Sequence, residues 1–107
     1  MKKERREKFR EAGYQVLSTQ KLLNLSDEEM ALIDLKITLI QKLRDVRKGA
    51  GLTQKQLAKL MKSSQSRIAM IESGSTDVSM ELICRALFTL GVSSKELGKT
   101  ISSAKVA

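Results

Sequence analysis

Residues 51–74 read GLTQKQLAKLMKSSQSRIAMIESG and predict two short helices separated by a tight turn. Thr53 and Gln56 have the spacing of a capping box, which opens the first helix. Ser64 is placed to cap the second helix, and Gly74 ends it. Apolar side chains recur at helical spacing and predict one buried face on each helix: Leu57, Ala58 and Met61 on the first, Ile68 and Ile71 on the second.

The outward face of the second helix carries Gln65, Ser66, Arg67 and Met70, which have no catalytic repertoire. Two helices joined by such a turn form a helix-turn-helix, whose second helix suits the major groove of DNA. Glutamine can bond adenine in a bidentate way, arginine can bond guanine, and serine is adaptable. We therefore expect Gln65, Ser66 and Arg67 to read bases, against the plainer alternative of a solvated helix start. For Met70, contact with DNA and a place in the core both stay open.

The rest of this unit offers side chains to the phosphate backbone of DNA. The start of the first helix combines free amide groups with the positive end of the helix dipole, which favours phosphate contacts at Thr53, Gln54 and Lys55. Further candidates lie in the turn, after the second helix and upstream of the unit: Lys62, Ser63, Ser64, Ser75, Thr76 and Arg44.

More helix is predicted on either side of residues 51–74. Capping patterns and apolar spacing predict a helix over about 26–48, a second over 79–90 and a short turn over 93–97. Residues 30–40 are apolar nearly all round, so we expect cover on more than one side, from residues 14–25 or from a second subunit. The domains expected are an N-terminal helical extension over 1–36, a DNA-binding domain over 37–97 and a flexible tail over 98–107.

Composition excludes several classes of function. A chain of 107 residues with no proline and few glycines favours one all-α domain. The absence of histidine removes the usual general base, and with Cys84 as the one cysteine neither a zinc site nor a disulfide framework is expected. We therefore expect no enzyme activity, no metal and no cofactor. No apolar run reaches membrane-spanning length and no signal peptide is evident, so the expected location is cytoplasmic.

The net charge of +8 is concentrated in one segment. Residues 41–67 hold eight basic side chains against one acid, Asp45, whereas residues 12–40 and 68–98 are each net negative by two. The eight are Lys42, Arg44, Arg47, Lys48, Lys55, Lys59, Lys62 and Arg67. This belt predicts a surface that faces a polyanion, with an ordinary solvated basic face as the alternative.

The stretch over 51–74, followed by VSMELICRALFTLGVSSKEL, resembles the Xre/Cro family of phage-repressor-like helix-turn-helix domains. The resemblance covers roughly residues 37–97 and is carried by Gly51-Leu52-Thr53-Gln54, Leu57-Ala58, Ser64, Ile68, Ile71-Glu72, Gly74 and Leu90-Gly91-Val92. It implies an all-α, five-helix bundle whose third helix reads DNA, usually as a dimer on a palindrome. It also places Gln54 at a backbone-clamping position, places Gln65, Ser66 and Met70 at base-reading positions, and has Glu72 help hold the loop before the fourth helix.

Two departures from the family pattern affect the surface. Lys62 and Ser63 stand where the family commonly has glycine and an apolar residue. Because a left-handed backbone costs about 1 kcal/mol without glycine, we expect a differently shaped turn. Leu60, Leu82 and Phe88 replace residues that are more often polar. The stripe Met80, Cys84 and Phe88 is expected on a different side from Ile83, Leu87 and Leu90. It is therefore a candidate interface, although a wide core-facing arc is the commoner explanation.

We predict a sequence-specific DNA-binding transcriptional regulator, a repressor that binds a palindromic operator as a homodimer through the helix at about 65–73. The alternative is the antitoxin of a type II toxin–antitoxin pair, which neutralises a protein toxin and represses its own operon. This alternative rests on the similarity of the chain to compact Xre-like antitoxins with an added helical segment. A protein-interaction module that has lost DNA binding is the competing class.

Overall fold

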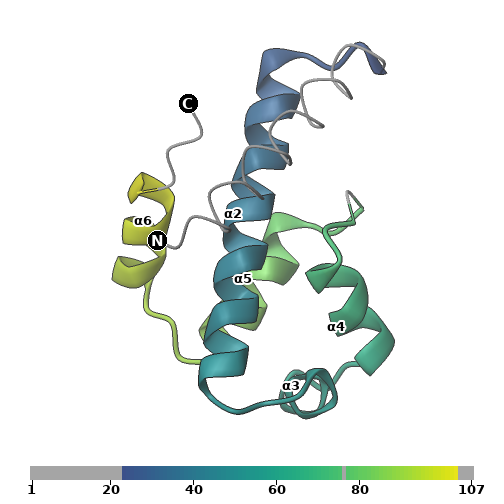
Figure 1. Cartoon of the computed structure of the whole chain (residues 1–107), viewed down its shortest axis with the longest axis vertical. Helices are drawn as coiled ribbons and strands as arrows, with labels where there is room; N and C mark the ends of the chain where they lie inside the picture. The colour runs from purple at the N-terminus through teal and green to yellow at the C-terminus, as the bar shows by residue number, and fades with distance from the viewer. Residues whose placement is uncertain (1–22, 76, 104–107) are drawn as a thin grey trace, which may run out of the picture. The chain divides into compact units, whose positions relative to one another are not determined.

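The computed structural model describes residues 23–75 and 77–103 of the chain. These residues form five helices and no strand: α2 (Asp27–Gly49), α3 (Gln54–Leu60), α4 (Gln65–Glu72), α5 (Met80–Thr89) and α6 (Ser94–Ser103) (Figure 1). The prediction of an all-α, five-helix bundle is confirmed. Predictions for residues 1–22, among them most of the N-terminal extension, lie outside the described residues, as do those for Thr76 and residues 104–107.

The chain divides into two compact units, one up to Leu32 and one from Ile33 onward. In the first unit the described residues contain the capping box that opens α2, with reciprocal bonds of 3.1 Å between Ser26 and Glu29. The second unit holds the helix-turn-helix. The predicted boundary between residues 36 and 37 stays a prediction, as does the cover expected from residues 14–25.

Local capping chemistry sets where the helices of the second unit begin. The Thr53 hydroxyl accepts from the Gln56 amide at 3.1 Å, and the Thr53 amide donates to the Gln56 side chain at 2.8 Å. Ser64 caps α4 and Ser79 caps α5 through their hydroxyls. Each bond satisfies an amide that the helix itself leaves unpaired, so the predicted starts of these helices are confirmed.

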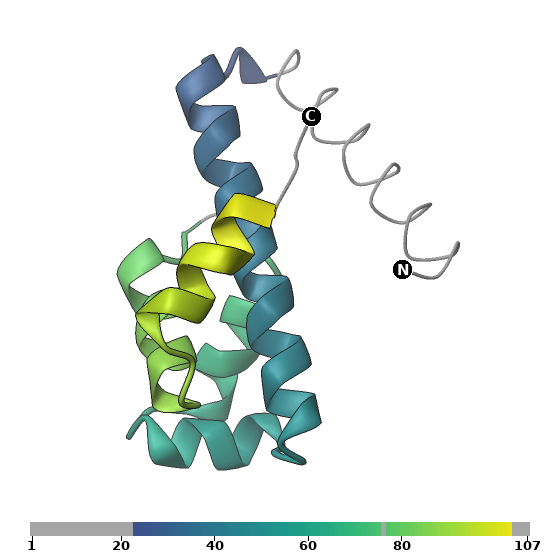
Figure 2. The same cartoon turned by 90° about the vertical axis from the view of Figure 1, so that its left-hand side faces the viewer.

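The core of the second unit forms where the apolar faces of its helices meet. Figures 1 and 2 show α3 across the C-terminal end of α2, with α4 and α6 on opposite sides of that helix. The buried residues come from α2 to α5 and the loops beside α5: Leu39, Ile40, Leu43, Leu57, Ala58, Ile68, Ile71, Val78, Ile83, Ala86, Leu87 and Val92. The expected inward faces of α3 and α4 are confirmed, and their burial fixes the outward face of α4.

The last helix is longer than the sequence predicted. The expected turn ends at Leu97, but α6 continues to Ser103. The half-buried Leu97 packs against the core, and the hydroxyls of Thr100 and Ser103 donate to carbonyls one turn back, at 3.0 Å and 2.8 Å. Residues 98–103 therefore belong to α6, while the flexible tail expected over 98–107 stays a prediction.

Among residues 23–75 and 77–103, no helix combines the length and apolar content that crossing a membrane requires.

Candidate nucleic-acid interface

The turn between α3 and α4 has the backbone shape that a glycine would give. Lys62 adopts a φ of 55°, in the left-handed region. The Ser63 amide donates to the Ala58 carbonyl at 2.8 Å, and the Lys62 amide donates to the Lys59 carbonyl at 3.2 Å. This is the hydrogen-bond pattern of a Schellman motif, with Lys62 at the position that glycine usually holds. The expectation of a differently shaped turn is wrong, because Lys62 itself takes the strained conformation.

A shallow groove of about 530 Å³ lies along this turn and the start of α4. Its lining consists of six residues predicted to contact DNA: Lys62, Ser63, Ser64, Ser66, Arg67 and Met70. Gln65 lies exposed in the same first turn of α4, outside the lining. Met70 is 42% exposed, so it belongs to this surface and not to the core. The structure thus brings together the turn and the predicted reading face of α4.

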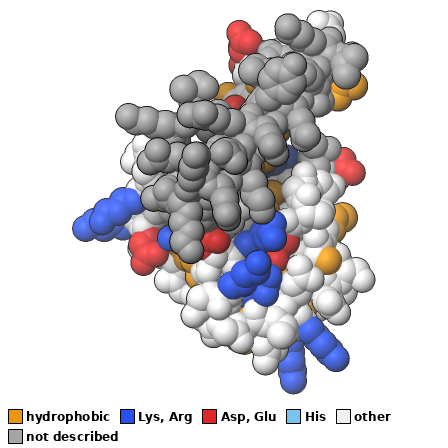
Figure 3. Space-filling model, viewed as in Figure 1, with side chains coloured by type: hydrophobic (Ala, Val, Ile, Leu, Met, Phe, Trp, Pro, Cys, Tyr) orange, Lys and Arg blue, Asp and Glu red, His pale blue; other side chains and the backbone are white. Residues whose placement is uncertain are grey.

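The groove is positively charged and rich in hydrogen-bonding groups. Its lining includes Lys62 and Arg67 and no acidic residue, while three serines supply hydroxyls. The surface over α3 and α4 is mostly uncharged, with basic side chains at its lower edge (Figure 3). No side-chain hydrogen bond within the protein occupies Gln65, Ser66 or Arg67 among the contacts of the described residues. Donors and acceptors at this surface are therefore available to a ligand.

A buried ion pair fastens the other end of α4. The Arg47 guanidinium donates to both carboxylate oxygens of Glu72, at 2.6 Å and 2.8 Å, and to the Leu52 carbonyl at 2.8 Å. Arg47 and Glu72 are only 8% and 6% exposed. Arg47 therefore does not belong to the exposed basic belt. Glu72 joins α4 to the end of α2, and the expectation that it holds the loop before α5 is wrong.

The predicted phosphate contacts at the start of α3 are partly committed within the protein. The Gln54 side-chain amide donates to Glu72 at 3.2 Å, and the capping box occupies the Thr53 hydroxyl. Lys55 is exposed. Of these three residues, Lys55 has the charge and the exposure for a phosphate contact, while Gln54 is held in place beside the last turn of α4.

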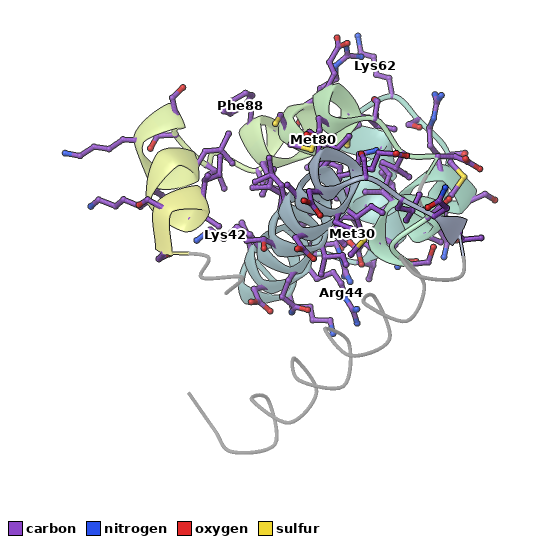
Figure 4. All side chains as sticks on the ribbon, turned by 90° about the horizontal axis from the view of Figure 1, so that it is seen from above. Met30, Lys42, Arg44, Lys62, Met80 and Phe88 are labelled. Atoms are coloured by element: carbon purple, nitrogen blue, oxygen red, sulfur yellow. The ribbon has the colours of Figure 1, made fainter. Side chains whose placement is uncertain are left out.

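Two remaining candidates lie apart from the groove. In Figure 4, which looks along the bundle from above, Arg44 and Lys62 lie on opposite sides. The structure therefore does not bring Arg44 to the surface that Lys62 helps to form. Ser75 follows α4, and its half-buried hydroxyl accepts from the Asp77 amide at 3.4 Å.

Sequence reasoning missed the positioning role of Arg47, although its helical phase indicates it. Leu39, Leu43 and Arg47 follow one another at intervals of four, and the first two are fully buried. The same phase continues through Arg47, so this side chain points into the bundle rather than outward. Glu72 stands four residues after the buried Ile68 and follows the same rule. A count of charged residues that ignores helical phase does not reveal that Arg47 and Glu72 are buried.

Within the described residues, no group of three acidic, cysteine or histidine side chains is placed to hold a metal ion. The chemistry of the surface is that of hydrogen-bond donors, acceptors and cations.

Comparisons with known proteins agree with this geometry. A model of the helix-turn-helix family matches residues 43–97, more than half of the chain. A protein of Haemophilus influenzae described as an uncharacterized HTH-type transcriptional regulator is 36% identical over 66 residues, which cover 62% of this chain and 67% of that protein. No solved structure matches the chain. With two helices joined at a Schellman turn, an outward-facing polar helix start and a matching family model, the chain belongs to the Xre/Cro-like helix-turn-helix family.

Proposed function

We propose that this chain is a sequence-specific DNA-binding transcriptional regulator of the cytoplasm, a repressor that binds a palindromic operator as a homodimer. The observation that carries the proposal is the acid-free groove in which Lys62, Ser66, Arg67 and Met70 meet at the start of α4. An anion is favoured there, and the exposed polar side chains are of the types that bond base edges.

The dimensions of α4 fit a major groove. An α-helix with its side chains is about 10–12 Å across, which is close to the groove width of about 12 Å, and the short, polar side chains at the start of α4 keep this face narrow. Lys62 precedes the start of α4, whereas the bond between Gln54 and Glu72 places the start of α3 beside its end. Cations at Lys62 and Lys55 are therefore available near opposite ends of the reading helix, where the two phosphate backbones would lie.

A homodimer is proposed because one short helix contacts too few bases for useful specificity. Two copies would read half-sites separated by about one turn of DNA, roughly 34 Å. A protein bound across a promoter in this way excludes the transcription machinery, which makes repression the simplest outcome.

The test compares a base-reading variant with a backbone-contact variant. Gln65→Ala is expected to lose about 1–3 kcal/mol of discrimination at one base position, because a bidentate contact is removed. Lys55→Ala is expected to weaken binding to all sequences alike and to lower the salt slope by about 1. A selected operator and single-base variants of it would be titrated by fluorescence anisotropy. Equal, sequence-independent losses from both substitutions would overturn the assignment of α4 as the reading helix.

Two alternative functions can be distinguished from the proposed regulator by simple measurements. An interaction module that has lost DNA binding would show no binding to random duplex at low salt and micromolar protein. An antitoxin would bind DNA and would also copurify with the toxic protein encoded by a neighbouring gene. The groove beside Lys62 supports DNA as the ligand under both the regulator and the antitoxin reading.

A further inference from the structure

Helix α5 carries a partly exposed apolar stripe at the edge of the face that it buries. Ile83 and Leu87 are fully buried and hold the helix against the core. Beside this face, Met80, Cys84 and Phe88 form a stripe with a spacing of four residues: Met80 and Cys84 are half-buried and pack against the edge of the core, and Phe88 is 47% exposed. A shallow hollow of about 510 Å³ runs along this face beside Cys84 and Phe88. In Figure 4, Phe88 lies at the rim of the bundle, on the side of Lys62 and away from Arg44.

We propose that a second copy of this chain covers this face, with the two α5 helices packed antiparallel about a two-fold axis beside Cys84. This proposal rests on the homodimer of the proposed function and deepens it by naming the surface through which the two copies meet. The occupant is inferred from two properties of the face, its register and its charge.

The register of the stripe is self-complementary. Cys84 is equidistant from Met80 and Phe88 along the helix, so an antiparallel copy centred on Cys84 places Met80 of one protomer opposite Phe88 of the other. Both pairs lie about 6 Å from the axis at a rise of 1.5 Å per residue. A thioether against an aromatic ring is a favourable contact, and the two small thiols meet at the centre. An isologous interface requires this kind of match of a surface with itself.

The charges beside the stripe match themselves as well. Glu81 and Arg85 flank it on one side and form an exposed ion pair at 3.0 Å. A two-fold axis beside Cys84 keeps both residues of each copy on the same flank. It brings Glu81 of one protomer to within roughly 3 Å, along the helix direction, of Arg85 of the other. Two chains of net charge +8 repel each other, so they meet most easily at a face whose own charges cancel.

Sedimentation equilibrium of the full chain without DNA tests this surface. The unchanged chain is expected to dimerise at micromolar concentration, and Phe88→Glu is expected to sediment at half that mass with the same helical content. Ile101→Glu is the matched control, because it places the same charge at an exposed apolar residue on α6 and is expected to stay dimeric. A monomeric unchanged chain, or a dimer that survives Phe88→Glu, would overturn the proposal and would point to another surface or occupant.

A charge exchange tests the register. Glu81→Arg and Arg85→Glu each place like charges across the axis and are expected to weaken the dimer at least tenfold, whereas the double exchange is expected to restore it. If the double variant is as monomeric as the single ones, the antiparallel register is wrong.

Cys84 provides an independent measurement, because it is the one cysteine of the chain. Oxidation with copper phenanthroline is expected to give a disulfide-linked dimer in the unchanged chain and little in Phe88→Glu. Absence of the cross-link in a dimeric chain contradicts the central place of Cys84. None of these assays contains DNA, so a dimeric chain that fails to bind DNA would refute the proposed function alone. A monomeric chain that binds a half-site would refute this interface alone.

Discussion

At the scale of single residues, the clearest local strain lies at the turn of the helix-turn-helix. Lys62 has a φ of 55°, and the bonds on either side of it hold the backbone there. A left-handed backbone position favours glycine, because glycine has no Cβ that would clash with the neighbouring carbonyl oxygen. The backbone strain and the positive charge therefore belong to the same residue. One substitution removes both, and two different assays measure the two effects.

Lys62→Gly is expected to stabilise the fold by about 1 kcal/mol while weakening DNA binding, because it relieves the strained backbone and removes a cation from the groove. Urea unfolding and anisotropy titration measure the two effects. Lys59→Gly is the matched control: it lies inside α3 and is expected to cost about 0.5–1 kcal/mol. A lower urea midpoint for Lys62→Gly would show that the turn does not carry this strain.

At the scale of elements, one buried cluster joins three helices. Arg47 from α2, Gln54 from α3 and Glu72 from α4 share bonds of 2.6 to 3.2 Å. Such a pair adds little over an apolar substitute, but removal of one partner leaves a buried charge without compensation. The cluster therefore determines where α4 ends relative to α2 and α3.

Glu72→Ala is expected to destabilise the fold by about 3–5 kcal/mol, because Arg47 would stay buried without its partner. The double variant Arg47→Met/Glu72→Met is expected to recover most of that loss. Thermal unfolding measures both. Asp45→Ala, which removes an exposed carboxylate from α2, is the control and is expected to cost at most about 1 kcal/mol. A similar cost for Glu72→Ala and Asp45→Ala would contradict the role of the cluster.

How far these elements could be predicted depends on the range of the forces that set them. Capping residues act within one turn, so the starts at Thr53, Ser64 and Ser79 could be read from the sequence. The end of α6 could not, because its threonine and serines have weak helix propensity and the packing of Leu97 is a tertiary contact. The left-handed Lys62 was missed for another reason: its hydrogen bonds are local, but no glycine marks the position in the sequence.

The candidate site divides in the same way. The residues of the groove were predicted because they are neighbours in the chain, from Lys62 to Met70. Arg44 is remote in sequence from that segment, and charge alone could not show on which side of the bundle it lies. Burial of Arg47 required the helical phase of α2 together with a partner from α4.

At the scale of the whole molecule, the net charge of +8 is a poor guide to the charge on the surface that we propose to face DNA. Arg47 is buried and paired, and Arg44 lies on the side of the bundle away from Lys62. Among the described residues, Lys55 and Lys62 are the exposed cations that we propose to contact phosphate beside the reading helix, and Arg67 is proposed to read a base. We expect the number of such phosphate contacts, rather than the +8 of the chain, to set how binding depends on salt.

The plot of log affinity against log salt is expected to have a slope of about −4 for the dimer on a full operator, from two phosphate-neutralising cations in each protomer. Phe88→Glu on a half-site is expected to give about −2 by the same relation. Titrations over a range of potassium chloride measure both slopes. A slope near zero would contradict an electrostatic contact, and equal slopes for the two would contradict the doubling of the contact surface.

The asymmetric attachment of α4 has a consequence for how operator preference evolves. Ile68, Ile71 and Glu72 carry the packing and the ion pair, and all three lie after the first turn of the helix. The side chains in the first turn of the helix, those of Gln65, Ser66 and Arg67, are exposed and take no part in this packing or in the ion pair. Under the proposed function, substitutions at these three positions are expected to change the preferred operator with little loss of stability. Duplicated copies of such a chain can diverge into separate regulators by a few changes in one helical turn.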